Sequence, residues 1–186
     1  MPGEPTYLKG QLLLDGGNLS GSFFNRAVVL ICNHDADGAF GLTLNHAVGD
    51  LVDDVLDADL PALIKELPVF LGGPVQPGAL SFLHADDFLP DANVMPGLNL
   101  EHSLDTLMEL GDSWSKTQQI KIFAGYAGWS PRQLEGEMDR ESWLTLPATV
   151  DLVFNTKPEA LWKTIISSMG PEYRLMADSP DDLSRN

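Results

Sequence analysis

The chain has 186 residues, of which 44% are hydrophobic and 20% charged, which is typical of a folded domain with one core. Its formal net charge of -16 at pH 7 repels nucleic-acid phosphates and anionic membrane surfaces, so we expect neither as a partner. We expect a single domain over residues 1–177 and a polar tail over 178–186.

The negative charge is concentrated in the first part of the chain. Residues 1–112 carry 3 basic and 17 acidic side chains, so -14 of the net charge of -16 lies there. An acidic surface is most often a solvated face, and it can also favour a basic protein partner. We expect any partner to be a protein or a small ligand.

Cysteine content and hydropathy indicate a soluble cytoplasmic protein. The one cysteine, Cys32, excludes an intramolecular disulfide bond and a zinc site made of several thiolates. Residues 1–10, MPGEPTYLKG, have neither the basic nor the apolar segment of a signal peptide. The longest aliphatic run, AVVLIC at 27–32, is far shorter than the roughly 18 residues of a membrane span.

Short apolar runs bounded by Gly, Pro, Asn or Asp predict strands. These runs are QLLL at 11–14, AVVLIC at 27–32, FGLTL at 40–44, VFLGG at 69–73, LSFLHA at 80–85, IKIFAG at 120–125 and DLVF at 151–154. The pair Asp37-Gly38 suits a tight turn with positive φ. The second and third runs therefore predict an antiparallel hairpin.

Helices are predicted between and after these strands. Ser103 can cap a helix over 103–112, and residues 50–67 can hold one or two helical turns broken by Pro61. The strongest pattern is TKPEALWKTIISSMGP at 156–171, where Thr156 can begin a capping box and apolar residues recur at helical spacing. Strands with helices scattered among them favour an α+β fold.

The turn GYAGW at 125–129 is the best candidate for ligand binding. A strand that breaks over glycines before a helix exposes backbone N–H groups, while the tyrosine can form a hydrogen bond and the tryptophan can stack. The next residues, SPRQL at 130–134, resemble a helix start with a capping box, so packing explains many of the same features. The candidate ligand-binding residues of this turn are Gly125, Tyr126, Gly128 and Trp129.

A second glycine turn, GGPV at 72–75, follows a predicted strand. Gly72 and Gly73 indicate a sharp bend or a close backbone approach, and we include both among the candidate ligand-binding residues. The segment lacks the lysine and the spacing of a P-loop and does not match GxGxxG. It therefore does not indicate a nucleotide site.

The sequence contains no complete catalytic or metal-binding motif. NHDADG at 33–38 begins like a calcium loop, but Leu44 stands where a bidentate glutamate is needed, and a hairpin turn explains the segment better. The histidines form no HExxH pair, and there is no GxSxG elbow. We predict no catalytic residue, no metal site and no cofactor. The alternative is an unrecognised hydrolase or metal-dependent enzyme that uses His84, Asp86, Asp87 or His34.

Cys32 is predicted to be an inert core residue. It alternates with His34 along one predicted strand, which would place both on one face and allow a thiolate pair. Cys32 also closes a buried aliphatic run, and cysteine is among the most buried residue types. The core interpretation is therefore favoured over the reactive one.

Four stretches, taken in order, resemble the AlgH/YqgE family of largely uncharacterised bacterial proteins. They are LKGQLLLDGGNLSGSFFNRAVVLICNHDADGAFGLTLNH, VFLGGPVQPGALSFLH, IFAGYAGWSPRQLEGEMDRESWL, and DLVF followed by LWKTIISSMG. The resemblance implies one α+β domain with a mixed, largely antiparallel sheet, partly closed into a small barrel and surrounded by helices. The chain departs from the family pattern at Ser130 and Arg132, where small, glycine-like residues are usual.

The resemblance implies no established activity. Some members of the family are labelled transcriptional regulators, but this chain has no helix-turn-helix pattern and the wrong sign of charge for DNA. We therefore predict a non-catalytic binding or regulatory protein that acts through a protein partner or a small ligand. An enzyme is the alternative, and direct DNA binding is the least favoured hypothesis.

Overall fold

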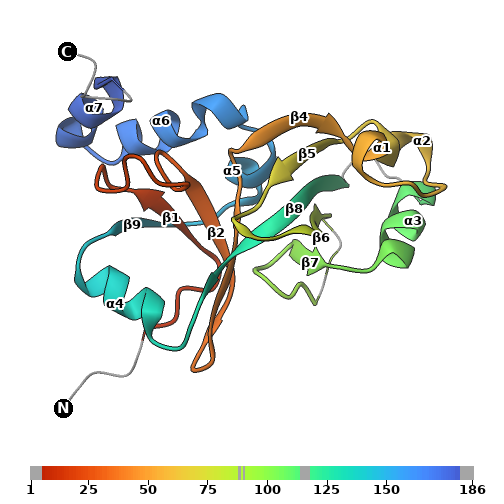
Figure 1. The fold of residues 1–186 in the computed structure, drawn as a ribbon, viewed down its shortest axis with the longest axis horizontal. Coiled ribbons are helices and arrows are strands. Elements are labelled where there is room, and N and C mark those ends of the chain that lie inside the picture. The colour runs from red at the N-terminus through yellow and green to blue at the C-terminus, as the bar shows by residue number, and fades with distance from the viewer. Residues whose placement is uncertain (1–5, 88, 90, 114–117, 181–186) are drawn as a thin grey trace.

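The computed structural model describes residues 6–87, 89, 91–113 and 118–180 (Figure 1). Its strands are β1 (Gln11–Asp15), β2 (Val28–Asp35), β3 (Gly38–Thr43), β4 (Ala47–Leu51), β5 (Pro68–Leu71), β6 (Val75–Ala85), β7 (Leu98–Glu101), β8 (Gln119–Trp129) and β9 (Trp143–Pro147). Its helices are α1 (Val52–Val55), α2 (Ala62–Lys65), α3 (Leu104–Asp112), α4 (Gln133–Asp139), α5 (Val150–Phe154), α6 (Pro158–Ser168) and α7 (Pro171–Asp178). Of the predicted polar tail, residues 181–186 lie outside the described residues.

The strands form a mixed, largely antiparallel sheet. Their order is β4-β5-β8-β3-β2-β1-β9, with β6 paired to β8 and β7 paired to β6. The β5–β8 pair is parallel and the other strand pairs of the described residues are antiparallel. The α+β prediction is therefore confirmed. The path of strands is open at β4 and β9 in the part of the chain described, so the sheet is not closed into the implied barrel.

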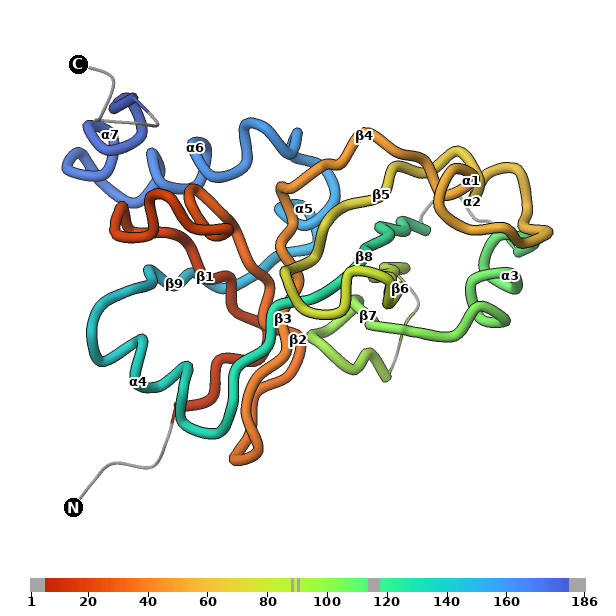
Figure 2. The backbone as a smooth tube through the Cα atoms, viewed as in Figure 1, coloured from red at the N-terminus to blue at the C-terminus, as the bar shows by residue number. Residues whose placement is uncertain are grey.

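The long strand β8 joins the two halves of the molecule. Its residues Gln119–Ala124 pair with β6, Ile122–Ala124 also pair with β5, and Ala127–Trp129 pair with β3. In Figure 2, β8 runs through the middle of the molecule, between the half that contains α1, α2 and α3 and the half that contains α4, α6 and α7.

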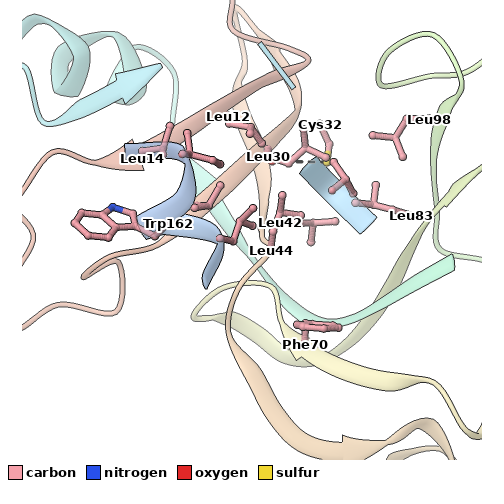
Figure 3. Close-up of a cluster of buried hydrophobic side chains, with 14 of the residues drawn as sticks. Leu12, Leu14, Leu30, Cys32, Leu42, Leu44, Phe70, Leu83, Leu98 and Trp162 are labelled. Atoms are coloured by element: carbon pink, nitrogen blue, oxygen red, sulfur yellow. Dashed lines mark hydrogen bonds between the residues drawn. The ribbon is translucent and has the colours of Figure 1, made fainter. Parts of the chain in front are cut away.

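Apolar side chains on both faces of the sheet form three clusters. The largest is covered by α5 and α6, and Figure 3 shows its members Leu12, Leu14, Leu30, Cys32, Leu42, Leu44, Phe70, Leu83, Leu98 and Trp162. The second lies on the opposite face beside α4, with Leu13, Val29, Ile31, Trp129, Leu134 and Trp143 among its members. Burial on both faces explains why 27–32 is an uninterrupted apolar run. The third cluster lies beneath α1, α2 and α3.

Several predicted elements are confirmed. The hairpin of β2 and β3 pairs Asp35 with Gly38, and Ser103 caps α3 because its Oγ accepts a hydrogen bond from the N–H of Thr106, 3.4 Å away. Pro61 separates α1 from α2, as its place in the sequence indicated. Leu107 is buried under α3, whereas Leu104, on the same turn, is 40% exposed.

Two predictions about the C-terminal part are wrong. DLVF at 151–154 lies in helix α5 and not in a strand, because Thr149 caps it with a hydrogen bond from the N–H of Leu152 to Thr149 Oγ1 (3.2 Å). A short apolar run fits either element, so the cap decides the outcome. Helix α6 begins at Pro158 after Lys157, without a side-chain cap, so Thr156 does not form the predicted capping box.

The prediction that Cys32 and His34 share a strand face is also wrong. The register of β2 against β3 shifts between Ile31 and Asn33, so Cys32 is an extra residue in the manner of a β-bulge. Cys32 therefore packs in the largest cluster. His34 contacts the α4 side instead, where its Nε2 lies 3.4 Å from Glu135 Oε1.

Candidate functional site

The two glycine turns, GGPV at 72–75 and GYAGW at 125–129, lie side by side, and their backbones are in direct contact. Val75 is paired with Tyr126, and a Cβ added to Gly73 would lie 2.0 Å from the carbonyl carbon of Tyr126. A Cβ added to Gly72 would lie 2.4 Å from the carbonyl oxygen of Gly125. Gly125 itself has a φ of 71°, in the left-handed region that favours glycine. The glycines are required by the close crossing of the β5–β6 connection and β8.

Trp129 is held by packing and by one carboxylate. The side chain is 7% exposed, and its Nε1 donates to Glu137 Oε2 at 2.9 Å. Trp143 Nε1 donates to the same oxygen at 2.8 Å. One acidic side chain on α4 therefore satisfies two indole N–H groups, which fixes the helix against the sheet.

The start of α4 differs from the predicted capping box. The helix begins at Gln133, and the preceding Arg132 has a φ of 64°, in the left-handed region that favours glycine. Half of the box is present, because Gln133 Oε1 accepts a hydrogen bond from the N–H of Ser130 at 3.0 Å. The predicted packing is found as well, since Trp129 and Leu134 belong to one buried cluster.

Tyr126 and Gly128 lie on a different part of the surface. The half-buried ring of Tyr126 stacks on Phe40 with 4.8 Å between centroids, and it also covers Gly128, whose added Cβ would lie 3.2 Å from Tyr126 Cε2. Phe40 makes an edge contact with the ring of His102 at 6.0 Å. A row of aromatic rings thus runs from Tyr126 through Phe40 to His102.

His102 lies at the edge of an apolar cavity of about 280 Å³, which we call the α1–α3 cavity. Its walls come from α1, β6, β8 and the start of α3. The lining residues are Val52, Val55, Leu56, Gly78, Leu80, Ser81, Phe82, His102, Ser103, Leu104, Leu107 and Ile122. None of the six predicted ligand-binding residues is among them, and those six remain a prediction.

The cavity has a buried apolar floor and an exposed apolar rim. Val52, Phe82 and Ile122 are buried members of the third cluster and form the floor. Val55 and Leu104 lie at the rim, where they are 44% and 40% exposed. Large apolar side chains that line a cavity and remain exposed are typical of a surface that binds an apolar group.

Local folding places the rim residues. Helix α1 is short and starts where Asp54 Oδ2 accepts a hydrogen bond from the N–H of Leu51 at 2.8 Å, so Val52 turns inward and Val55 outward. Helix α3 packs closely on the α2 segment at Gly111, where an added Cβ would lie 2.7 Å from Ile64 Cγ1. These contacts hold α1, α2 and α3 together at one end of the molecule (Figure 1).

The cavity lies in the most acidic part of the chain. Residues 47–112 contain 13 Asp and Glu residues and a single basic residue, Lys65. Lys65 forms an ion pair with Asp53 on α1, with 3.5 Å between Nζ and Oδ1. Exposed Asp57 and Asp105 directly follow the lining residues Leu56 and Leu104. Exposed carboxylates therefore lie next in sequence to lining residues, and we call Asp53, Asp57 and Asp105 the acidic margin.

The residues of the enzyme alternative lie in two places, with His84, Asp86 and Asp87 at and just after the end of β6 and His34 on β2. The Nε2 atom of buried His84 lies 3.3 Å from Asn99 Nδ2, and Asn99 Nδ2 donates a hydrogen bond to Glu101 Oε1 at 2.7 Å. Burial lowers the pKa of His84. Asp86 is half-buried and Asp87 is exposed in the segment after β6. Within the described ranges, no three His, Cys, Asp or Glu side chains are grouped as metal ligands.

His34 and Cys32 make structural contacts. His34 Nδ1 accepts a hydrogen bond from the N–H of Leu8 at 3.0 Å and thereby ties the segment before β1 to the sheet. Burial raises the pKa of the Cys32 thiol, so the reactive thiolate is disfavoured. Neither side chain lines the α1–α3 cavity.

Together the open mixed sheet, the close crossing of two glycine turns and the helices α1, α2 and α3 at one end define an α+β fold. Residues 12–174 match the model of the AlgH-like family, DUF179. UPF0301 proteins from Chlorobium luteolum and Shewanella denitrificans are each 36% identical to the chain; they cover 92% and 88% of it, and each is matched over 91% of its own length. The chain belongs to the AlgH-like family, which confirms the resemblance seen in its motifs.

Solved structures share this fold. The AlgH protein from Pseudomonas aeruginosa is 28% identical with a TM-score of 0.74, and the match covers 97% of this chain and 98% of that one. A protein from Corynebacterium diphtheriae has a TM-score of 0.78 at 20% identity, and the match covers 95% of this chain and 94% of that one. At this low identity the similarity concerns the fold only. In the part of the chain that the structure describes, no helix combines the length and apolarity needed to cross a membrane.

Proposed function

We propose that this AlgH-like protein is a non-catalytic binding protein, and that the α1–α3 cavity receives an apolar group of its partner or ligand. The observation that carries the proposal is the cavity itself, about 280 Å³ with a buried apolar floor and exposed apolar side chains at its rim. Leaving Val55 and Leu104 in water forgoes stabilisation of about 1 kcal/mol or more per side chain, which a bound apolar group can recover.

The surface beside the cavity can extend the contact. His102 belongs to the cavity and touches Phe40, which stacks on Tyr126. Aromatic rings give a bound partner large contact area at low entropic cost. The predicted role of Tyr126 and Gly128 in ligand contact is therefore kept as part of this proposal, next to the cavity.

Methyl NMR spectroscopy tests the proposal directly. Neutral apolar fragments such as toluene and indole are titrated into the full chain labelled at Leu, Val and Ile methyl groups. We expect the largest shifts at Val55, Leu104 and Ile122, with dissociation constants in the millimolar range typical of such small ligands. The absence of shifts around the cavity with every fragment would contradict the proposal.

A filled cavity provides the matched control. Gly78 lines the cavity, and a Cβ added there meets no atom within 4 Å, so Gly78→Leu adds a large apolar side chain at the cavity without a clash at its Cβ. This variant should abolish the fragment shifts. Leu175→Ala removes an exposed leucine from α7, at the other end of the molecule, and should leave them unchanged.

A further inference from the structure

We propose that the occupant of the α1–α3 cavity is a basic amphipathic segment of another protein. The segment inserts one large apolar side chain into the cavity and places Lys or Arg side chains against the acidic margin. This inference rests on the proposed function, because it requires the cavity to be a binding site. It adds the chemical class of the partner.

The size of the cavity suits an inserted apolar side chain. Pockets that hold drug-sized ligands or cofactors measure roughly 300–1,000 Å³ and enclose most of the ligand. At about 280 Å³, the α1–α3 cavity falls just below that range. One large apolar side chain from an amphipathic helix matches a site of this size.

The charge around the cavity selects a cationic partner. Asp53, Asp57 and Asp105 are exposed next to lining residues of α1 and α3. Lys65 is already paired with Asp53, and it is the single basic residue in 47–112. Exposed carboxylates attract basic partners and repel acidic ones, which affects the association rate and specificity most strongly.

A second copy of this chain is a poor occupant for the same reason. In a symmetric dimer through this surface, each acidic margin would face the same acidic margin of the other copy. The copies also carry a formal charge of -16 each, so long-range repulsion opposes their approach at low salt. The charge therefore favours a different chain with the opposite sign.

Three peptides of about 14 residues, four helical turns, test the inference. The first has Leu and Phe on one helical face and Lys on the other. The second keeps the apolar face and replaces every Lys by Glu, and the third keeps Lys and replaces the apolar face by Ser. Each carries a fluorophore, and binding to the full chain is followed by anisotropy. We expect the first peptide alone to bind.

Salt and charge variants identify the source of the attraction. The affinity for the first peptide should fall about tenfold between about 50 and 300 mM NaCl, because salt screens exposed charges. The triple variant Asp53→Asn, Asp57→Asn, Asp105→Asn should weaken binding about tenfold at low salt and flatten the salt dependence. Asp139→Asn with Glu141→Gln removes two exposed carboxylates near α4 and should have less than a twofold effect.

The outcomes separate this inference from the proposed function. Equal binding of the Lys and Glu peptides, with neutral fragments still bound in the cavity, overturns the basic partner and leaves the binding cavity in place. Binding of the Ser peptide as tight as that of the first overturns the inserted side chain. A dimer in sedimentation analysis that Gly78→Leu dissociates identifies a second copy as the occupant and also overturns the inference.

Discussion

Lys121 is a buried cation in an apolar environment. It lies on β8, 8% exposed, with Nζ donating to the carbonyl oxygen of Val153 at 3.1 Å and lying 4.3 Å from the centre of the Phe70 ring. Burial lowers the pKa of Lys121 to about 8, because a charge in an apolar site loses its hydration. The charged form therefore costs stability.

The pH dependence follows from the sign of this shift. Between pH 8 and 10.5 the unfolded chain holds the Lys121 proton and the folded chain releases it, so stability rises with pH across that window. We expect the wild type to gain about 2 kcal/mol relative to Lys121→Met between pH 7 and pH 10. Urea unfolding of both proteins at several pH values measures the difference. A constant difference would show that the Lys121 charge is not penalised in the folded state.

Single residues show where sequence reasoning succeeds and where it fails. Cys32 is buried and inert, as its place at the end of an aliphatic run indicated. Strict alternation along the strand wrongly predicted that His34 lies on the same face as Cys32. The bulge at Cys32 arises from the pairing of β2 with β3, and the periodicity of one strand contains no information about that pairing. The left-handed backbone conformation of Arg132 likewise has no signal in the sequence and is seen only in the structure.

Several helices and strands that begin or end at a capping residue or a tight turn were predicted from that local signal. The β2–β3 hairpin and α3 follow from Asp37-Gly38 and from Ser103. Strand β9 was not predicted, and it pairs with β1. Strands β4 and β7 were not predicted either, since β4 is exposed along its length and β7 has four residues. Their conformation comes from pairing with β5 and β6, a non-local effect that overrides weak local preference.

The crossing of the β5–β6 connection over β8 leaves no room for a side chain at Gly73. Gly73→Ala places a Cβ 2.0 Å from backbone atoms of Tyr126, which cannot move aside without disrupting β8. We expect the free energy of unfolding to fall by about 3 kcal/mol or more, or the variant to fail to fold. Gly78→Ala is the matched control, because its Cβ meets nothing within 4 Å, and it should change stability by less than about 0.5 kcal/mol. Thermal unfolding of both variants measures the difference in stability. Equal melting temperatures would contradict the close crossing.

For the molecule as a whole, the acidity was evident from the sequence and the cavity was not. Residues 1–112 hold most of the net charge, and α1, α2 and α3 all lie within that part of the chain. The cavity is lined by segments as far apart as Val52 and Ile122, and no local motif connects them. The exposure of Val55 and Leu104 could not be predicted either, because a helical pattern alone predicts that such apolar residues are buried.

The concentration of negative charge predicts a response to salt. Repulsion among carboxylates destabilises the compact state, and salt screens it over a Debye length of about 10 Å at 0.1 M. We expect the melting temperature to rise by about 3–6 °C between about 20 and 500 mM NaCl. The variant Asp53→Asn, Asp57→Asn, Asp105→Asn should rise by less. A melting temperature that stays constant or falls would show that this repulsion does not limit stability.

The central place of β8 has a consequence for how the chain is made. β8 ends at residue 129, whereas its partners β3, β5 and β6 end at residues 43, 71 and 85. At roughly 5–20 residues per second, a ribosome needs about 2–9 s to extend the chain from the end of β6 to the end of β8. During that interval the growing chain carries three strand edges that await their partner, and unpaired edges invite association between chains. The nascent protein is most vulnerable to aggregation in this interval, before β8 has emerged.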